Sequence, residues 1–180
     1  MVLTVTPWGS VRMKVIKRFH LFGSVGKNCS IMHKTLPLYS NLVFIHDNVR
    51  VASHVGFVTH DIIHRMLNNR NGGGTFVEKV GCIEIMNNVF VGSGTRILNN
   101  TRIGNNVIIG SGSLVTKDIP DNSVYAGVPA RRICSFDEYV VKHKAYSESF
   151  RKKFGIDEVC GVDDSLAAKL YEDFQKSRKR

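Results

Sequence analysis

The chain has 180 residues, 43% of them apolar, and its 25 Lys and Arg against 15 Asp and Glu give a net charge of +10. This length and composition predict one globular domain with a small appendage. No apolar run approaches the ~20 residues that a membrane span needs. No apolar segment precedes a small-residue cleavage site near the N-terminus, so we expect a cytoplasmic protein.

The excess positive charge has more than one interpretation. Ten of the Lys and Arg lie from Lys142 onward, which favours a solvated basic tail. Attraction of an anionic cofactor or substrate is the alternative. No recognised nucleic-acid motif accompanies the charge, so we expect no nucleic-acid partner. The cysteines form no CxxC pair, which indicates reduced structural thiols at Cys29, Cys82, Cys134 and Cys160.

Residues 1–22 lack the repeat that follows and are predicted to be a short amphipathic cap. We expect its polar side to carry Arg12, Lys14, Lys17 and Arg18, and its apolar side Val11, Val15, Ile16, Phe19 and Phe22. Such a segment would protect the unpaired edge at one end of a repeat structure.

Six-residue repeats begin at Val25 and Ile31, break near Leu36, and resume with repeats that open at Ile45, Val51 and Phe57. Between residues 62 and 81 the repeat disappears around the polar stretch 68–74. Loops of this length inside a compact fold are more often functional than accidental. We therefore expect a protruding functional loop at 62–81.

The stretch 85–120 consists of six sextets that open with Ile85, Val91, Ile97, Ile103, Ile109 and Val115. One large aliphatic residue every six positions fits neither an amphipathic helix nor an ordinary strand. It predicts a coil of three short strands per turn with one aliphatic side chain directed inward from each face, a β-helix. Asn and Gly tolerate the left-handed backbone that sharp corners need, and they recur at the third and fourth positions.

The coil is predicted to finish at 123–133 and to be followed by two helices, over 137–153 and 164–176, with Asp164 as the N-cap of the second. The expected organisation is a cap at 1–22, a β-helix domain at 23–133 with the loop at 62–81, and a helical extension at 134–180. The predicted fold class is all-β with C-terminal α-helices.

Two groups of polar residues suggest chemistry. His60, followed by Asp61, lies at a corner directly before the loop, where an outward histidine can act as a general base. A surface histidine that caps a turn is the structural alternative. His54, His60 and His64 could instead hold zinc, but His54 and His60 are one sextet apart and should lie on different faces. We therefore expect no metal.

The second group is formed by 109–120 and 126–132, which are rich in small residues and carry Thr116, Lys117 and Arg131. Small side chains would let a thin ligand lie along the coil, with Lys or Arg pairing with phosphate. The alternative is that Gly and Ser merely form corners.

The ending Val115-Thr-Lys-Asp-Ile-Pro120, followed by Ala126-Gly-Val-Pro-Ala-Arg131, resembles the hexapeptide-repeat acyltransferases. The segments 45–61 and 83 onward resemble the sugar O-acetyltransferase branch. The resemblance implies a left-handed parallel β-helix, acetyl-CoA as acyl donor and a homotrimer with the donor in a groove between subunits. It also implies direct transfer of the acetyl group to a hydroxyl of a sugar or polysaccharide precursor.

Carried over residue by residue, the resemblance makes His60 the general base, with Asp61 or Glu84 as its carboxylate partner. It assigns donor binding to Gly92, Ser93, Gly110, Ser111, Thr116, Lys117, Ala126, Gly127, Pro129 and Arg131. An amino sugar, serine or a xenobiotic is an alternative acceptor. A non-catalytic trimeric binding module and a zinc hydrolyase of the carbonic anhydrase type are the alternatives from other functional classes.

Overall fold

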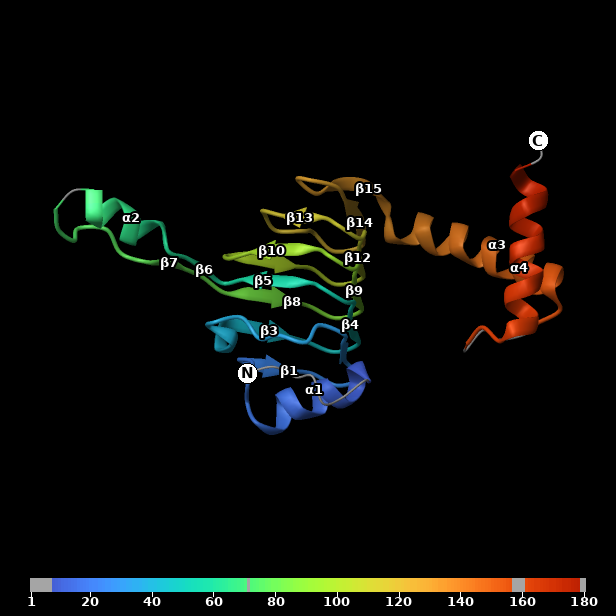
Figure 1. Ribbon diagram of the computed structural model, residues 1–180, viewed down its shortest axis with the longest axis horizontal. Coiled ribbons are helices and arrows are strands. Elements are labelled where there is room, and N and C mark those ends of the chain that lie inside the picture. The colour runs from blue at the N-terminus through green and yellow to red at the C-terminus, as the bar shows by residue number, and fades with distance from the viewer. Residues whose placement is uncertain (1–7, 71, 157–160, 179–180) are drawn as a thin grey trace. The chain divides into compact units, whose positions relative to one another are not determined.

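In the computed structural model, the sextets form a coil of short strands stacked along one axis (Figure 1). The structure describes residues 8–70, 72–156 and 161–178. It divides into two units, residues 1–136 and residues 137–180. Cys160 lies outside the described residues, and the other three cysteines are free thiols.

The coil has three faces, each formed by a sheet whose strands come from successive turns. Face 1 contains β1 (Ser24–Val25), β3 (Val43–Ile45), β8 (Ile83–Ile85) and β11 (Thr101–Ile103). Face 2 contains β2 (Ser30–Ile31), β4 (Val49–Val51), β9 (Val89–Val91), β12 (Val107–Ile109), β14 (Ser123–Ala126) and β15 (Arg131–Ser135). Face 3 contains β5 (Gly56–Val58), β10 (Arg96–Leu98) and β13 (Leu114–Val115).

The strand register shows that three sextets make one turn. Val89 pairs with Val107 and Ile83 with Thr101, in each case one turn of eighteen residues apart and parallel. Pairing turns antiparallel only between β14 and β15, at the end of the stack, among the strands of face 2. The predicted β-helix of hexapeptide repeats is thereby confirmed.

The core is a set of ladders of aliphatic side chains inside the coil. The residues that open the sextets are at most 1% exposed, namely Ile85, Val91, Ile97, Ile103, Ile109 and Val115. The fifth position of each sextet is buried as well, by Val89, Thr95, Thr101, Val107, Ser113 and Ile119. Each turn thus buries apolar surface against the turns above and below it, which is the dominant favourable contribution to folding.

The corner between faces 1 and 2 is held by a ladder of asparagines, the asparagine edge, which consists of Asn28, Asn48, Asn88, Asn106 and Asn122. All five have a positive φ, between 51° and 58°. The side-chain amide of each of the first four donates to the side-chain oxygen of the next, at 2.8–2.9 Å. The predicted use of Asn in left-handed corners is confirmed here, and the side chains also link the turns.

A second corner, between faces 2 and 3, consists of residues 92–94 and 110–112 and is called the glycine–serine edge. Gly94 and Gly112 have φ of +73° and +70° and make the sharp bend. At Gly92 a Cβ would lie 2.5 Å from the backbone nitrogen of Ser111, and at Gly110 it would lie 2.8 Å from the Cβ of Ala126. These two glycines are therefore required by the close approach of successive turns rather than by the bend.

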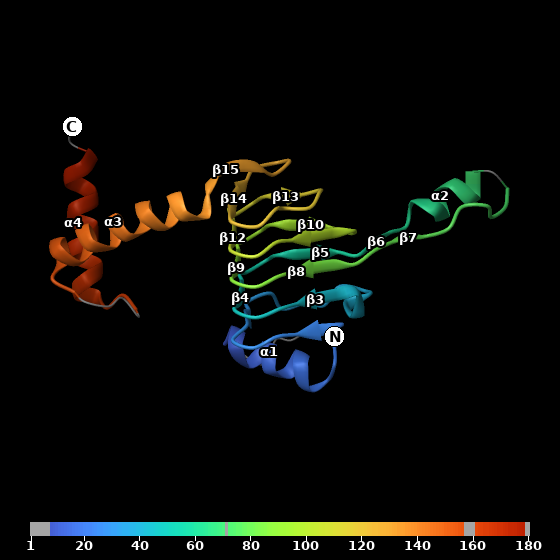
Figure 2. The same ribbon diagram turned by 180° about the vertical axis from the view of Figure 1, so that it is seen from behind.

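The third corner, between faces 3 and 1, is where the predicted loop leaves the stack, and it is called the arm edge. Figures 1 and 2 show this arm, residues 60–80, leaving at the level of β5 and β8. It is more ordered than the sequence suggested, because β6 (His60–Asp61) pairs antiparallel with β7 (Lys79–Val80) and α2 (Ile63–Arg70) lies between them. Asn68 also ties the polar stretch together, since its side chain bonds the backbone of Thr75 and Phe76.

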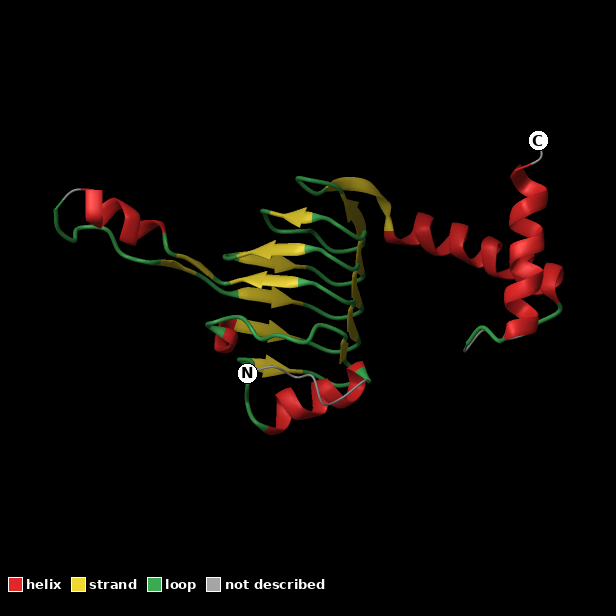
Figure 3. Ribbon diagram, viewed as in Figure 1, coloured by secondary structure: helices red, strands yellow, loops and turns green. Residues whose placement is uncertain are grey.

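The helix α1 (Gly9–Arg18) packs against β1 and β2 at the N-terminal end of the stack (Figure 3). Its predicted polar side is wrong in one respect, because Arg12 is only 2% exposed. The Nη1 of Arg12 donates to the carbonyls of Ile31 and Met32, which satisfies the backbone of the first turn. Phe19, predicted on the apolar side, is 65% exposed. After the first turn, η1 (Ser40–Leu42) occupies the stretch where the repeat breaks.

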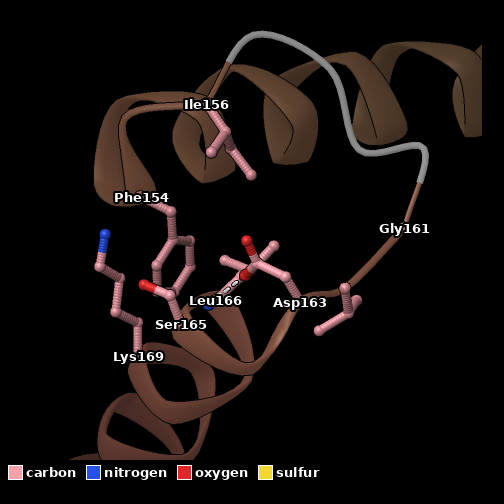
Figure 4. Close-up of a pocket in the computed structure, with 8 residues that line it drawn as sticks. Phe154, Ile156, Gly161, Asp163, Ser165, Leu166 and Lys169 are labelled. Carbon is pink, nitrogen blue, oxygen red and sulfur yellow. Dashed lines mark hydrogen bonds between the residues drawn. The ribbon is translucent and has the colours of Figure 1, made fainter.

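The second unit contains α3 (Phe136–Phe154) and α4 (Asp164–Arg178), close to the two predicted helices. Asp163, not Asp164, caps α4, because its Oδ1 accepts from the backbone N–H of Leu166 at 2.7 Å. Phe154, Ile156 and Leu166 line a cavity beside this cap (Figure 4). None of the helices in the described part of the chain combines the length and the apolar composition that a membrane span requires.

Asn106 offers a test of the asparagine edge. Asn106→Gly keeps the left-handed backbone and removes the side-chain bonds, whereas Asn106→Ala also strains the backbone. We expect Asn106→Ala to lower the free energy of unfolding by about 1 kcal/mol more than Asn106→Gly, measured by denaturant unfolding. Equal losses in the two variants would contradict a backbone requirement at this corner.

Candidate active site

The predicted base, His60, lies on the arm edge, on the first residue of β6. Its Nδ1 is buried and has no hydrogen-bond partner among the described residues. The ring of Tyr39 packs edge-on against the imidazole, with 5.1 Å between centroids and an interplanar angle of 74°. Because Nδ1 is buried, a reactant that bonds this ring must do so at Nε2.

Tyr39 is itself fixed by the base of the arm. Its hydroxyl donates to Oε2 of Glu78 at 2.9 Å. Glu78 is the residue directly before β7. This bond raises the pKa of Tyr39, so the phenol stays protonated and remains the donor. Tyr39 and Glu78 therefore connect the ring of His60 to both the coil and the returning strand of the arm. Sequence reasoning missed both residues because they lie where the repeat is broken.

The two candidate carboxylate partners are engaged elsewhere. Asp61 accepts from the backbone N–H of Ile63 at 3.1 Å and so begins α2. Glu84, on face 1, accepts from Nε2 of His46 at 3.0 Å and from Nε of Arg102 at 2.6 Å. Within the described part of the chain, neither carboxylate is hydrogen-bonded to His60. Tyr39 supplies the ring contact that orients the histidine instead.

Six of the predicted donor-binding residues fall on two corners, namely Gly92, Ser93, Gly110, Ser111, Thr116 and Lys117. Ser93 and Ser111 are exposed on the glycine–serine edge, and the N–H of Gly112 donates to the carbonyl of Ser93 at 2.8 Å, so the two small-residue corners stack directly. Thr116 and Lys117 follow β13 on the arm edge, the edge that also carries His60. Face 3 separates the two edges within one chain.

The segment 127–130 lies along β13 at the end of face 3. The N–H of Leu114 donates to the carbonyl of Gly127 at 3.0 Å, and the N–H of Ala130 donates to the carbonyl of Leu114 at 2.8 Å. The structure thus places Ala126, Gly127, Pro129 and Arg131 in the last turn and strands of the stack. They lie at the opposite end of the coil from its first turn.

The predicted alternative metal set is divided between corners. His54 lies at the corner between faces 2 and 3, whereas His60 lies on the arm edge and His64 on α2. Over residues 8–70, 72–156 and 161–178, no group of three or more His, Cys, Asp or Glu side chains is placed to hold a metal ion.

Comparison with known proteins agrees with the fold and with the repeat. A family model described as bacterial transferase hexapeptide (six repeats) matches residues 83–117. The galactoside O-acetyltransferase of Lactococcus lactis is 33% identical, over 82% of this chain and 76% of that protein. The chain therefore belongs to the hexapeptide-repeat acetyltransferase family and is an acetyltransferase by class.

A second protein sequence and one solved structure are also similar to this chain. Protein CapG of Staphylococcus aureus is 36% identical, over 66% of this chain and 69% of that protein. A solved structure of galactoside acetyltransferase in complex with coenzyme A superposes with a TM-score of 0.54 at 28% identity, over 86% of this chain and 78% of that one.

Glu84 gives a pH-dependent test of the face 1 cluster. The hydrogen bond from His46 and then that from Arg102 lower the pKa of Glu84, against burial, which raises it. A carboxylate with a lowered folded-state pKa stabilises the protein above its unfolded pKa of about 4.3, and this contribution is lost as the pH falls through the folded value.

We therefore expect Glu84→Gln to lower the thermal unfolding midpoint at pH 7 and to lower it less at pH 3, where protonation of Glu84 has begun to remove the contribution. Circular dichroism melts at both pH values measure the effect. Glu148→Gln, on α3, is the matched control and should alter neither midpoint. An equal loss at both pH values in Glu84→Gln would show that packing, not charge, is responsible.

Proposed function

We propose that the chain is an acetyl-CoA-dependent O-acetyltransferase that acts on a hydroxyl of a sugar or polysaccharide precursor, with His60 as general base. The observation that carries the proposal is the placement of His60. Its ring is held by Tyr39 at the corner where the arm leaves the coil, with Nδ1 buried, in a chain of the acetyltransferase family. The galactoside O-acetyltransferase among the relatives supports a sugar hydroxyl as acceptor.

His60 would accept the proton of the acceptor hydroxyl on Nε2. Since the Tyr39 ring and the β6–β7 pairing fix the imidazole, little reorientation is needed when the proton moves. Histidine is the side chain that most often serves as a general base in enzymes, because its ring can both accept and release a proton. The acceptor oxygen forms the new C–O bond, the C–S bond of the donor breaks, and His60 returns the proton to the leaving sulfur.

Acetyl-CoA supplies the acyl group as a thioester, and the small-residue corners fit such a thin donor. Gly92 and Gly110 leave no side chain outside the coil, and Ser93 and Ser111 are exposed beside them. Lys117 and Arg131 lie toward the end of the stack, where they would pair with phosphates. The solved galactoside acetyltransferase is a complex with coenzyme A, which supports this assignment.

We infer a homotrimer from the division of the site. His60 lies on the arm edge and the small-residue stretch on the glycine–serine edge, with face 3 between them in one chain. A cyclic assembly that sets the arm edge of one copy against the glycine–serine edge of the next would join the two halves. Each of its interfaces would then hold one complete site.

His60→Ala should lower the acetylation rate by roughly 10²–10⁴-fold, because that is the usual contribution of general-base catalysis. Release of free CoA thiol with a panel of sugars measures the rate, and light scattering checks that the assembly is intact. His143→Ala, in the second unit, is the control and should keep full activity. Full activity in His60→Ala would remove the catalytic assignment.

Mixed assemblies test the shared site directly. Ser111→Trp would block the donor groove, and His60→Ala removes the base, so each variant alone should be inactive. Coexpressed, they should recover about a quarter of wild-type activity, because a quarter of the interfaces in a random cyclic mixture combine the two intact halves. No recovery in mixed assemblies of confirmed composition would place the whole site within one chain.

A further inference from the structure

The residues at the glycine–serine edge become larger and more basic toward the N-terminal end of the stack. The N–H of Gly94 donates to the carbonyl of Ser53 at 2.9 Å, and the N–H of Met32 donates to the carbonyl of Val51 at 2.8 Å. Residues 52–54 and 32–34 therefore continue the corner downward by one and two turns. In place of Gly-Ser-Gly these turns carry His54 and His33.

His54 occupies the corner position that Gly94 and Gly112 occupy in the turns above. Its φ is +60°, and its side chain is exposed. A left-handed backbone is less favourable for His than for Gly. The corner geometry alone would be served better by glycine, so the side chain of His54 is unexplained by the fold.

Arg96 brings a guanidinium to the same place. It lies on β10 of face 3, and a Cβ on Gly56 would collide with its Nη1, so its side chain reaches down across Gly56 onto the turn that carries His54. The absence of a side chain at Gly56 leaves room for this arrangement. Arg96 is exposed, so its guanidinium is available to a ligand.

These groups act on one another and are all basic. Burial lowers the pKa of His33, and the charges of His54, Arg96 and Arg12 lower it further, which favours a neutral ring that can only donate an N–H to an anion. Its Nε2 lies 2.5 Å from Oγ1 of Thr35, and the permanent positive charge at this corner is that of Arg96. The segments that build face 3 and this corner, residues 32–36, 51–59, 92–98 and 110–117, contain no Asp or Glu. The whole of residues 1–136 carries fifteen Lys and Arg against six Asp and Glu, so the net positive charge belongs to this unit rather than to the C-terminal helices.

We propose that His33, His54 and Arg96 form an anion-binding subsite for the acceptor, and that the acceptor is a sugar that carries a phosphate or a carboxylate. Surfaces lined by one sign of charge concentrate ligands of the opposite sign, and a guanidinium pairs well with both anions. The inference rests on the proposed function and trimer. His54 and His60 belong to the same turn, so an axis parallel to the stack would bring His54 of one copy level with His60 of the next. The donor groove lies one turn above, at residues 92–94.

The test compares galactose 1-phosphate and galacturonate with methyl galactoside as acceptors, in the full-length protein with acetyl-CoA. We expect kcat/KM to favour at least one anionic sugar by about tenfold or more, and added salt to reduce this preference. The sugar phosphate and the sugar acid distinguish the two sources of charge. Equal values of kcat/KM for the charged and neutral acceptors would overturn the proposal.

Two variants locate the effect. Arg96→Gln removes the charge and keeps a long side chain, and His54→Gly keeps the left-handed corner. Each should lower kcat/KM for the preferred anionic sugar by about tenfold and leave methyl galactoside and the KM for acetyl-CoA unchanged. Arg50→Gln, on face 2, is the matched control and should change none of these values. A rise confined to the KM for acetyl-CoA would assign the cluster to the donor and refute the proposal.

Binding of galactose 1-phosphate, measured by calorimetry, separates this inference from the proposed function. Millimolar or tighter binding that Arg96→Gln weakens about tenfold would support the subsite even if no sugar were acetylated. Activity on methyl galactoside without any binding of galactose 1-phosphate or galacturonate would support the acetyltransferase and refute the subsite.

Discussion

Every turn of the coil depends on its neighbours to bury the inward aliphatic side chains. Ile97 and Ile103 are fully buried because the turns above and below cover them, and no turn could form such a core alone. This requirement fixes the strand register, so insertions and changes of residue type are tolerated mainly at the corners. The arm is inserted at one corner, yet β3 still pairs with β8 and β4 with β9 on either side of it.

Because inward positions are committed to the core, the chemistry must come from corners and outward positions. The three corners have different compositions. The asparagine edge links turns through its own amides, the glycine–serine edge leaves space outside the coil, and the arm edge carries His60. Within one chain a full face separates the last two edges, and the homotrimer proposed above would bring them together between two copies.

The regular part of this structure could be predicted from the sequence because the sextets repeat the same local solution. The inward residues, the asparagine corners and the position of His60 all follow from register. The failures lie where register is lost. The burial of Arg12 depends on the carbonyls at the end of the coil, and the contact of Tyr39 with His60 joins two irregular segments. Spacing alone predicts neither.

The distribution of carboxylates distinguishes structural charge from charge that calls for a ligand. On face 1, Glu84 lies between His46 and Arg102, so the cations there are compensated within the fold. On face 3 and the corner below residues 92–94, His33, His54 and Arg96 have no nearby carboxylate in the segments that form this surface. Burial and the neighbouring charges of His54, Arg96 and Arg12 oppose a positive charge on His33, so the group does not stabilise the fold as an ion pair would. A fold held by aliphatic ladders gains nothing from them, which is why an anion in the acceptor accounts for their presence better than stability does.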